Sequence, residues 1–432
     1  MTDPIIIRPA LSARVPTGQS RTVAFADRFG GLGQGAVVEL RLPTSPSPAQ
    51  RMLSEILVDL CLRMDPIVSE IRISSGSPVV SAIVDAAAQR FPLEHRGGPL
   101  VELDVVRFAV GRSELPYVDA SDWLVGFNVP VGGGTGGDHP GGAFIGALEA
   151  AKYLFLRAAA IAYNRGADTP SWGEERVFDA WSWTWSARDG EPRTARLPSA
   201  APTIALVGCG GVGAAYLWFL RKTRFSGALL LLDDDIIEWS NMNRLFYATV
   251  QDADDQRPKV LSAAAYMNDG WSVRALARKA EHPEAAAALT ECARAGGLLA
   301  SAVGEPETRK FLGRRGFAAF FDAGTNSDGW ARALALRPGQ SRCSECEVQA
   351  RAAQRPGGCG QASTEVFAGV VPHLAAYAGV LLALEHVRVL LGAPVLGGSN
   401  TQSIMMDLEA ATRICSRRCP TCPTLPAAEP AA

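Results

Sequence analysis

The sequence predicts an α/β fold, with a mainly parallel, Rossmann-like sheet that carries helices on both of its faces. An apolar run at Ile204–Val207 enters a glycine-rich turn at residues 208–213, and a helical pattern follows from Ala214. A second apolar run, residues 228–232, ends in three aspartates. This order of strand, glycine turn, helix, strand and acid is typical of the opening unit of a nucleotide-binding sheet.

Composition limits the remaining choices. The chain has 432 residues, 47% of them hydrophobic and 20% charged, which suits a protein of two or three domains with full cores. A net charge of −2 gives no support to binding of nucleic acid or of acidic membranes. The first residues lack the pattern of a signal peptide. The apolar stretch 368–384 contains a proline and a histidine, so we expect a buried helix and no membrane span.

In the first half, strand-like patterns alternate with helical ones. A glycine-rich segment at residues 30–35 is interpreted as a turn, because a strand pattern follows it at 36–42. Residues 50–64 favour a helix, and residues 67–74 and 100–110 favour strands. An apolar run then leads into a second glycine-rich turn, and we expect a helix over about 141–163, followed by a join between the halves at 165–200. Within this join Trp181, Trp183 and Trp185 alternate, which suits a strand with one aromatic face.

One pattern occurs in both halves. Residues 147–154 and 383–390 both read A-L-E-x-x-K/R-x-L, which indicates two halves descended from one unit, unless two Ala/Leu-rich helices match by chance. No strand–glycine–helix unit is evident at the corresponding place in the first half, so we expect that half to be shortened.

The glycine turn predicts where phosphates bind. Gly208, Gly210, Gly211 and Gly213 would let backbone N–H groups approach a phosphate at a helix N-terminus. Asp233 would accept hydrogen bonds from ribose hydroxyls. These features alone fit NAD and ATP equally well.

Polar residues beyond the second strand favour ATP. Asn241, Arg244 and Lys259 supply the amide and the cations that would hold a triphosphate and stabilise charge on leaving pyrophosphate. A dinucleotide site does not need them.

Over about residues 202–422, the combination of GxGGxG, LDxDxxxxSNxxR and a following lysine resembles the ThiF/MoeB-like adenylyltransferases. The resemblance implies ATP-dependent adenylation of the C-terminal carboxylate of a ubiquitin-like protein. It also implies an inactive adenylation-like half (residues 1–195) joined to an active one (196–432) as an internal pseudo-dimer; further homodimerisation is left open.

The same resemblance carries expectations about Mg²⁺ and about an arginine. The family's magnesium-binding aspartate corresponds to Gly304 here, so Asp235 and Glu305 are the expected substitutes. Such enzymes often take an arginine from the partner half, and the N-terminal candidates are Arg8, Arg14 and Arg21.

The cysteines predict a structural zinc site and a nucleophile. Two CxxC pairs would complete a closed tetrahedral Zn²⁺ site, and they match the family's zinc positions: Cys343, Cys346, Cys419 and Cys422. Cys415 is a spare ligand. Cys359 lies in a loop, about residues 347–367, where the family carries its acyl-accepting cysteine, so it would form a thioester. Otherwise the enzyme only adenylates. Cys61, Cys209 and Cys292 are expected to be packing residues.

Two other functions stay open, an NAD(P)-dependent oxidoreductase and a non-catalytic scaffold that binds a ubiquitin-like protein. The expected partners of the adenylating enzyme are a ubiquitin-like protein and a conjugating enzyme of a bacterial conjugation system. Paired cysteines without a secretion signal favour a reducing cytoplasm.

Overall fold

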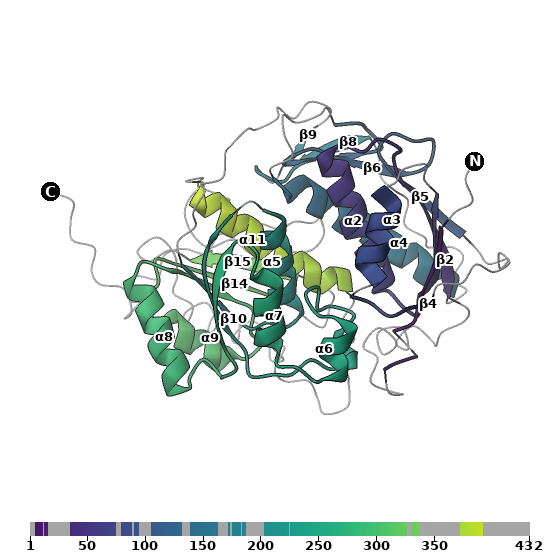
Figure 1. Cartoon of the computed structure of the whole chain (residues 1–432). Coiled ribbons are helices and arrows are strands. Elements are labelled where there is room, and N and C mark those ends of the chain that lie inside the picture. Colours follow the sequence, from purple (N-terminus) through teal and green to yellow (C-terminus); the bar gives the residue numbers. More distant parts are fainter. Residues whose placement is uncertain are drawn as a thin grey trace.

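Two β-sheets, one from each half of the chain, enclose a group of helices in the computed structural model (Figure 1). The structure describes residues 5–11, 13–15, 35–74, 79–88, 90–94, 105–131, 139–162, 172, 175–182, 184–186, 203–223, 225–325, 331–336 and 372–391.

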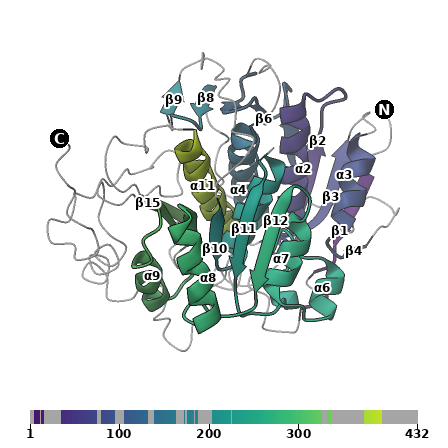
Figure 2. The ribbon, with the colours of Figure 1, turned by 60° about the vertical axis from the view of Figure 1, so that its left-hand side comes forward.

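The sheet of the second half has the strand order β12-β11-β10-β13-β14-β15. Figure 2 shows β12, β11 and β10 side by side. Its first five strands are parallel, and β15 runs antiparallel to β14. The strand order reverses between β10 and β13, which is where α/β sheets bind their ligands. The strands are β10 (Ile204–Val207), β11 (Gly227–Leu232), β12 (Trp271–Leu276), β13 (Leu298–Ser301), β14 (Ala319–Thr325) and β15 (Ala331–Leu336).

Helices cover both faces of this sheet. Alternate residues of one strand belong to two different cores: Leu206 lies in the cluster that faces the first half, and Val207 lies in the opposite cluster. This continuous apolar run is typical of a parallel strand buried on both sides. The inner cluster includes α5 (Gly211–Lys222), α7 (Lys259–Met267) and α11 (Pro372–Leu390); the outer one includes α8 (Pro283–Arg294) and α9 (Pro306–Gly313).

The sheet of the first half has nine strands in the order β4-β1-β3-β2-β5-β6-β7-β8-β9. Strands β3, β2, β5 and β6 are parallel and form its centre, and the strands outside them pair antiparallel. The strands are β1 (Ile5–Pro9), β2 (Ala36–Arg41), β3 (Val68–Ser74), β4 (Leu93–Glu94), β5 (Val105–Val110), β6 (Tyr117–Ala120), β7 (Leu124–Phe127), β8 (Arg176–Asp179) and β9 (Thr184–Ser186).

The two halves repeat one sequence of elements. Each has a strand–helix–strand unit, a reversal of strand order beside its first parallel strand, a final antiparallel strand and then a long helix. The first half is shorter between β5 and β6, where residues 111–116 replace the segment that contains α9. The helices of the first half are α2 (Pro48–Leu62), α3 (Val79–Ala88) and α4 (Gly141–Ala162). Corresponding elements are β2 and β10, α2 and α5, β3 and β11, β5 and β13, β6 and β14, β7 and β15, and α4 and α11.

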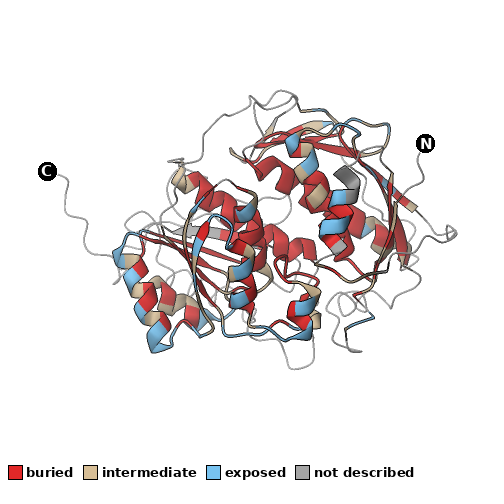
Figure 3. Ribbon diagram, viewed as in Figure 1, coloured by how far each residue is buried: buried red, intermediate tan, exposed pale blue. Residues whose placement is uncertain are grey.

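The long helices α4 and α11 pack against each other in antiparallel orientation. The start of α4 meets the end of α11, since a Cβ built on Gly141 would lie 3.2 Å from the Leu384 side chain. The end of α4 meets the start of α11, where the Phe155 and His373 rings lie 5.0 Å apart. One hydrophobic cluster therefore runs through both halves, and Figure 3 shows the helices between the sheets as mainly buried.

Most predicted elements of the described residues are confirmed, with two corrections. Helix α5 begins at Gly211, earlier than expected. Trp181 lies in the turn between β8 and β9, so the alternating tryptophans do not share one strand. These strands belong to the first sheet, so part of the expected join is structured.

The opening unit of the first half agrees with the sequence patterns. The strand expected at 36–42 and the helix expected at 50–64 are β2 and α2, and the connection between them contains no glycine, as expected. It is rich in proline and serine, and Ser47 caps α2: the Gln50 amide donates to Ser47 Oγ (3.2 Å) and the Ser47 amide to Gln50 Oε1 (3.0 Å).

One described helix, α11, is long and apolar enough to cross a membrane by length and composition. Its side chains are almost all buried against the other helices and the second sheet. This confirms the prediction of a buried helix in that region, although it extends to Leu390.

Candidate functional site

The turn between β10 and α5 is tightly folded. Gly208 has φ +94°, and its amide donates to the Leu232 carbonyl of β11 (2.8 Å). A Cβ at Gly208 would lie 2.8 Å from the Ala302 carbonyl oxygen, and one at Gly213 would lie 2.0 Å from that of Gly208. Only glycine fits these two positions. By contrast, a Cβ at Gly210 would meet nothing within 4 Å, so the turn is open at the N-terminus of α5.

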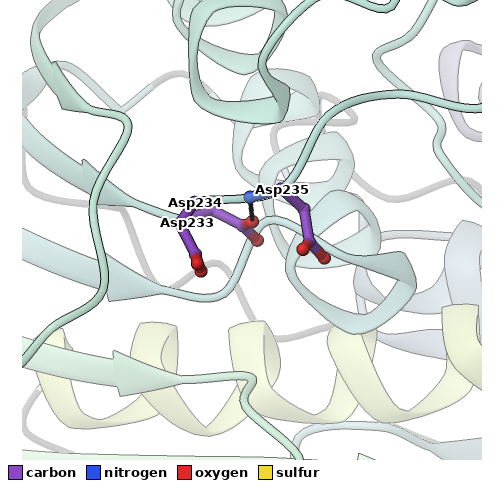
Figure 4. A group of neighbouring side chains, drawn as sticks. All are labelled: Asp233, Asp234 and Asp235. Carbon is purple, nitrogen blue, oxygen red and sulfur yellow. Dashed lines mark hydrogen bonds between the residues drawn. The ribbon is translucent and has the colours of Figure 1, made fainter.

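Asp233, at the end of β11, braces this turn. Its Oδ2 accepts from the Cys209 amide (2.6 Å) and its Oδ1 from the Asp235 amide (2.9 Å; Figure 4). Burial raises the pKa of Asp233, while the charge of Lys259 and these two amides oppose that rise. The carboxylate predicted to bind ribose is therefore also a part of the turn's own structure, which the sequence did not reveal.

Tyr247 holds the other side of the same peptide. Its hydroxyl donates to the Cys209 carbonyl (2.6 Å), and burial raises the pKa of Tyr247 well above its ordinary value. Sequence reasoning missed Tyr247, whose only signal was its position just after the Asn-Arg pair. The Cys209 side chain is buried, as predicted for a packing residue.

Lys259 reaches the same edge of the sheet from the start of α7. Its Nζ lies 2.6 Å from Asp235 Oδ2, and its amide donates to the Asp235 carbonyl (2.9 Å). The lysine side chain is only 10% exposed, whereas that of Asp235 is 67% exposed. The structure thus brings two predicted site residues together as an ion pair at the end of β11.

Arg244 lies across the start of α5. A Cβ built on Gly211 would lie 3.0 Å from Cδ of Arg244, so the aliphatic part of the arginine covers this glycine. Its Nη1 donates to the Ser240 carbonyl (2.8 Å) and to Asn243 Oδ1 (2.9 Å). Asn241 is buried at the end of η1 (Trp239–Asn241), and its Nδ2 donates to Ser240 Oγ (3.1 Å). These contacts place Arg244 at the N-terminus of α5, and its role as a phosphate-binding cation stays a prediction.

The expected magnesium ligands are not brought into one group. Among the described residues, the carboxylates that cluster here are those of Asp233, Asp234 and Asp235 (Figure 4), which are oxygen donors of the kind that Mg²⁺ prefers. Glu305 does not belong to this cluster. It is exposed before α9, where its Oε2 accepts from Thr308 Oγ1 (3.3 Å).

The structure distinguishes Arg8 from Arg14, two of the three N-terminal arginines considered as candidates for the first half's contribution. Arg8 is paired with the buried Glu70 within the first sheet (Nη2 to Oε2, 2.6 Å). Arg14 is exposed, and its guanidinium lies 5.5 Å from the ring centre of Trp239, directly before Ser240 and Asn241. Arg14 is therefore a first-half side chain at the edge of the second half's site. Arg21 lies outside the described residues.

The remaining predicted site residues also lie outside the described residues: Cys359 and its loop, the zinc ligands Cys343, Cys346, Cys419 and Cys422, and Cys415. Their roles stay predictions. Cys61 and Cys292 are buried, as expected of packing residues.

A family model described as the ThiF family matches residues 187–424, more than half of the chain. The chain belongs to the ThiF family. The glycine turn, Asp233, Arg244 and Lys259 all lie within this ThiF domain, which is a Rossmann-like, nucleotide-binding fold. The predicted extent of the resemblance, about 202–422, agrees with the match.

Comparison with solved structures gives only distant likenesses. The MccB protein of E. coli with ATP aligns with a TM-score of 0.40 at 16% identity, covering 52% of this chain and 67% of that one. MccB with N-formylated MccA gives 0.39 at 16% identity with the same coverage. PaaA gives 0.35 at 17%, covering 49% and 62%. No curated protein matches the chain. Likeness at this level assigns neither substrate nor partner to the ThiF domain described here.

Proposed function

We propose that this ThiF protein uses ATP to adenylate the C-terminal carboxylate of a protein or peptide. The observation that carries the proposal is the placement of two cations around one helix N-terminus. Arg244 covers Gly211 at the start of α5. Lys259 is paired with Asp235 just after β11, and the Asp235 amide donates to Asp233, the aspartate that braces the same turn. Cations and free helix amides are what a triphosphate needs.

The reaction follows from these positions. The phosphates lie on the open side of the glycine turn, where Arg244 and Lys259 neutralise their oxygens. A carboxylate oxygen attacks the α-phosphorus, and the bond between that phosphorus and the bridging oxygen breaks. Pyrophosphate leaves with the electron pair, and an acyl adenylate remains. Mg²⁺, bound to the phosphates and the acidic end of β11, would add charge neutralisation.

Arg14 is suited to supply a third positive charge to this site. It comes from the first half, it is exposed, and it lies beside the residue that precedes Ser240 and Asn241. Arg8 is committed to a buried carboxylate. We therefore assign to Arg14 the role of the arginine that the first half contributes to the triphosphate.

Within the described part of the first half, the connection that corresponds to the glycine turn lacks the features of a second nucleotide site. Where the ThiF domain has its glycine turn, this half has a proline-rich connection whose helix is capped by Ser47. The Gln50 side chain then donates to the buried Asp119 of β6 (Nε2 to Oδ1, 2.9 Å). At the start of α2, Pro48 has no N–H and the Gln50 amide already donates to Ser47, so fewer donors are left for a phosphate. This supports a pseudo-subunit that completes the active half.

The finer assignments rest on the sequence resemblance. The carboxylate belongs to a ubiquitin-like protein, Cys359 accepts the acyl group as a thioester, and a conjugating enzyme of a bacterial system receives it. Four cysteines hold a structural Zn²⁺.

Modifier-dependent exchange of pyrophosphate into ATP tests the proposal. The purified chain should catalyse exchange with a ubiquitin-like protein that ends in a free glycine carboxylate, and not with the same protein amidated at that carboxylate. ATP should raise the melting temperature and NAD should not. A shift with NAD alone would favour an oxidoreductase. Binding of the modifier without exchange would favour a scaffold.

A further inference from the structure

Arg63 connects the first half to the segment that carries Arg244. It is the C-cap residue of α2 and its side chain is fully buried. Its Nη1 donates to the Met242 carbonyl (2.5 Å) and lies 3.4 Å from the Leu245 carbonyl. These two carbonyls flank Arg244 in the chain, so a guanidinium from one half supports the turn that presents a phosphate-binding cation in the other.

Arg63 adds donors to a turn that is otherwise held by its own backbone hydrogen bonds. The amides of Arg244 and Leu245 both donate to the Asn241 carbonyl (3.0 and 3.2 Å). Arg63 donates to the carbonyls of Met242 and Leu245. The Leu245 carbonyl also accepts from the Ala248 amide (3.2 Å), whereas Arg63 is the donor described for the buried Met242 carbonyl. A buried carbonyl without a donor is destabilising, so removal of the guanidinium favours a different arrangement at Met242.

The surroundings hold the guanidinium in place. Asp59 Oδ1 lies 3.3 Å from its Nη2 and offsets part of the cost of burying its charge; burial is the main cause that lowers the pKa of Arg63. The guanidinium also lies 4.7 Å from the ring centre of Phe246, which is stacked on Trp218 of α5 at 4.3 Å. Arg63 is thus fixed against the same helix whose N-terminus Arg244 covers.

We propose that Arg63 is a positioning residue for the nucleotide site: it holds residues 241–245 so that Arg244 lies across Gly211. It touches no ligand itself. The first half then contributes two residues to the site. Arg14 lies at its edge, and Arg63 supports the turn that carries Arg244. The identity of the ligand in this inference rests on the proposed function. The effect of Arg63 on the structure of the turn does not.

Two variants separate this role from simple packing. Arg63→Lys keeps a charge for Asp59 but loses the planar group that reaches two carbonyls and stacks on Phe246. Arg63→Met keeps much of the volume and loses every donor. The matched control is Glu55→Gln, which weakens the ion pair of α2 with Lys222 of α5 (2.6 Å) and does not touch the turn.

The test measures amide hydrogen exchange and ATP response in the full chain. In both Arg63 variants, the amides of Arg244 and Leu245 should exchange at least about tenfold faster than in the wild type. The ATP concentration that gives a half-maximal melting shift should rise by a similar factor. Glu55→Gln should stay within about twofold of the wild type in both measurements.

The ATP response and the amide hydrogen exchange test different statements. If wild-type protein shows no response to ATP, the proposed function is wrong, while the exchange of the two amides still decides the role of Arg63. Should Arg63→Met not fold, Arg63→Lys decides alone, because it preserves the charge. Wild-type protection of both amides in Arg63→Lys, or the same loss of protection in Glu55→Gln, would overturn the inference.

Discussion

The peptide of Cys209 is fixed on both sides. Asp233 accepts its N–H and Tyr247 donates to its carbonyl, so the glycine turn is held in shape by residues from two other segments. A turn held in this way presents its open side, at Gly210, without first having to order itself around a ligand. Arg244 and Lys259 are both nearly buried, each held by hydrogen bonds within the second half. At the scale of the residue, the site is largely preorganised.

Lys259→Ala should abolish most pyrophosphate exchange and leave the fold intact. Loss of a cation that stabilises developing charge lowers the rate by about 100-fold or more. The partner, Asp235, is mostly exposed, so loss of the ion pair costs about 1 kcal/mol or less. Exchange assays and thermal melting check this. Lys310→Ala is the control, since its pair with Glu307 lies on α9 (2.7 Å). A folded Lys259→Ala variant with wild-type exchange would remove Lys259 from the mechanism.

Arg14→Ala and Arg8→Ala should have opposite effects. Arg14 is exposed, so its loss should leave the melting temperature unchanged and lower exchange by about 100-fold or more. Arg8→Ala removes one partner of the buried Glu70 and should lower the melting temperature, while exchange by the folded fraction persists. Both variants are measured for exchange and for melting. Full activity in Arg14→Ala would transfer the role to another arginine, with Arg21 the next to test.

The helices and strands were largely predictable because their periodicity is local. The unit β10–α5–β11 follows from an apolar run, a glycine turn and a second apolar run, and each lies where the sequence indicated. The start of α5 was placed too late because glycines count against a helix, although here they begin one. The alternating tryptophans misled for a similar reason. Asp179 accepts from the Trp181 amide (2.8 Å) and from Ser182 Oγ (2.7 Å), and this turn interrupts the strand pattern.

Helix α11 carries two buried histidines, and this predicts acid sensitivity. Burial lowers the pKa of His373 to about 3, with a further contribution from Lys152 of α4, and lowers that of His386 to about 3. Their ordinary pKa is 6.5, so between these values the unfolded chain binds protons that the folded chain does not. Stability is therefore present above pH 6.5 and is lost as the pH falls towards 3, by up to about 1.4 kcal/mol per pH unit for each histidine.

His373→Phe should reduce the dependence of the unfolding free energy on pH by the contribution of one of the two histidines. The variant keeps an aromatic ring beside Phe155. Denaturant unfolding at pH 6.5, 5.5 and 4.5 gives the slope of the unfolding free energy for both proteins. Equal slopes would mean that His373 is charged or hydrated in the folded state.

At the scale of the whole molecule, the sequence predicted two related halves from the repeat on α4 and α11. It indicated the strand and the helix that form β2 and α2, but not their correspondence to β10 and α5, because the connection between them lacks the glycine turn that makes such a unit recognisable. Contacts between the two halves could not be predicted from the sequence either. Nothing local marks Arg63 as a partner of Met242, since the two are far apart in the chain and meet only after both sheets have formed.

The chain should contain about one Zn²⁺. Elemental analysis of protein purified without added metal measures this directly. Cys419→Ser should lose the metal and lower the melting temperature, because a closed tetrahedral site contributes folding energy. Cys415→Ser is the matched control and should retain the metal. Wild-type protein without zinc would contradict the assignment of both CxxC pairs.

Cys359 should form a thioester with the modifier. A reductant-sensitive adduct between the two proteins is expected on a non-reducing gel, and Cys359→Ala should lose it while pyrophosphate exchange continues. The two steps separate because adenylation uses Arg244 and Lys259, and acyl transfer uses a thiol. An adduct that persists in Cys359→Ala would move the nucleophile elsewhere, with Cys415 next. Active exchange without any adduct would mean that the adenylate passes directly to an acceptor.

The proline-rich connection before α2 has one more consequence, for how this protein can change over generations. In an assembly of two identical chains, a substitution alters both copies at once, and a residue that supports the partner's site must also suit its own. Here α2 supports a site that it does not contain. The residues of α2, Arg63 among them, therefore do not have to form a nucleotide site in their own half. Selection can act on each half for a different function.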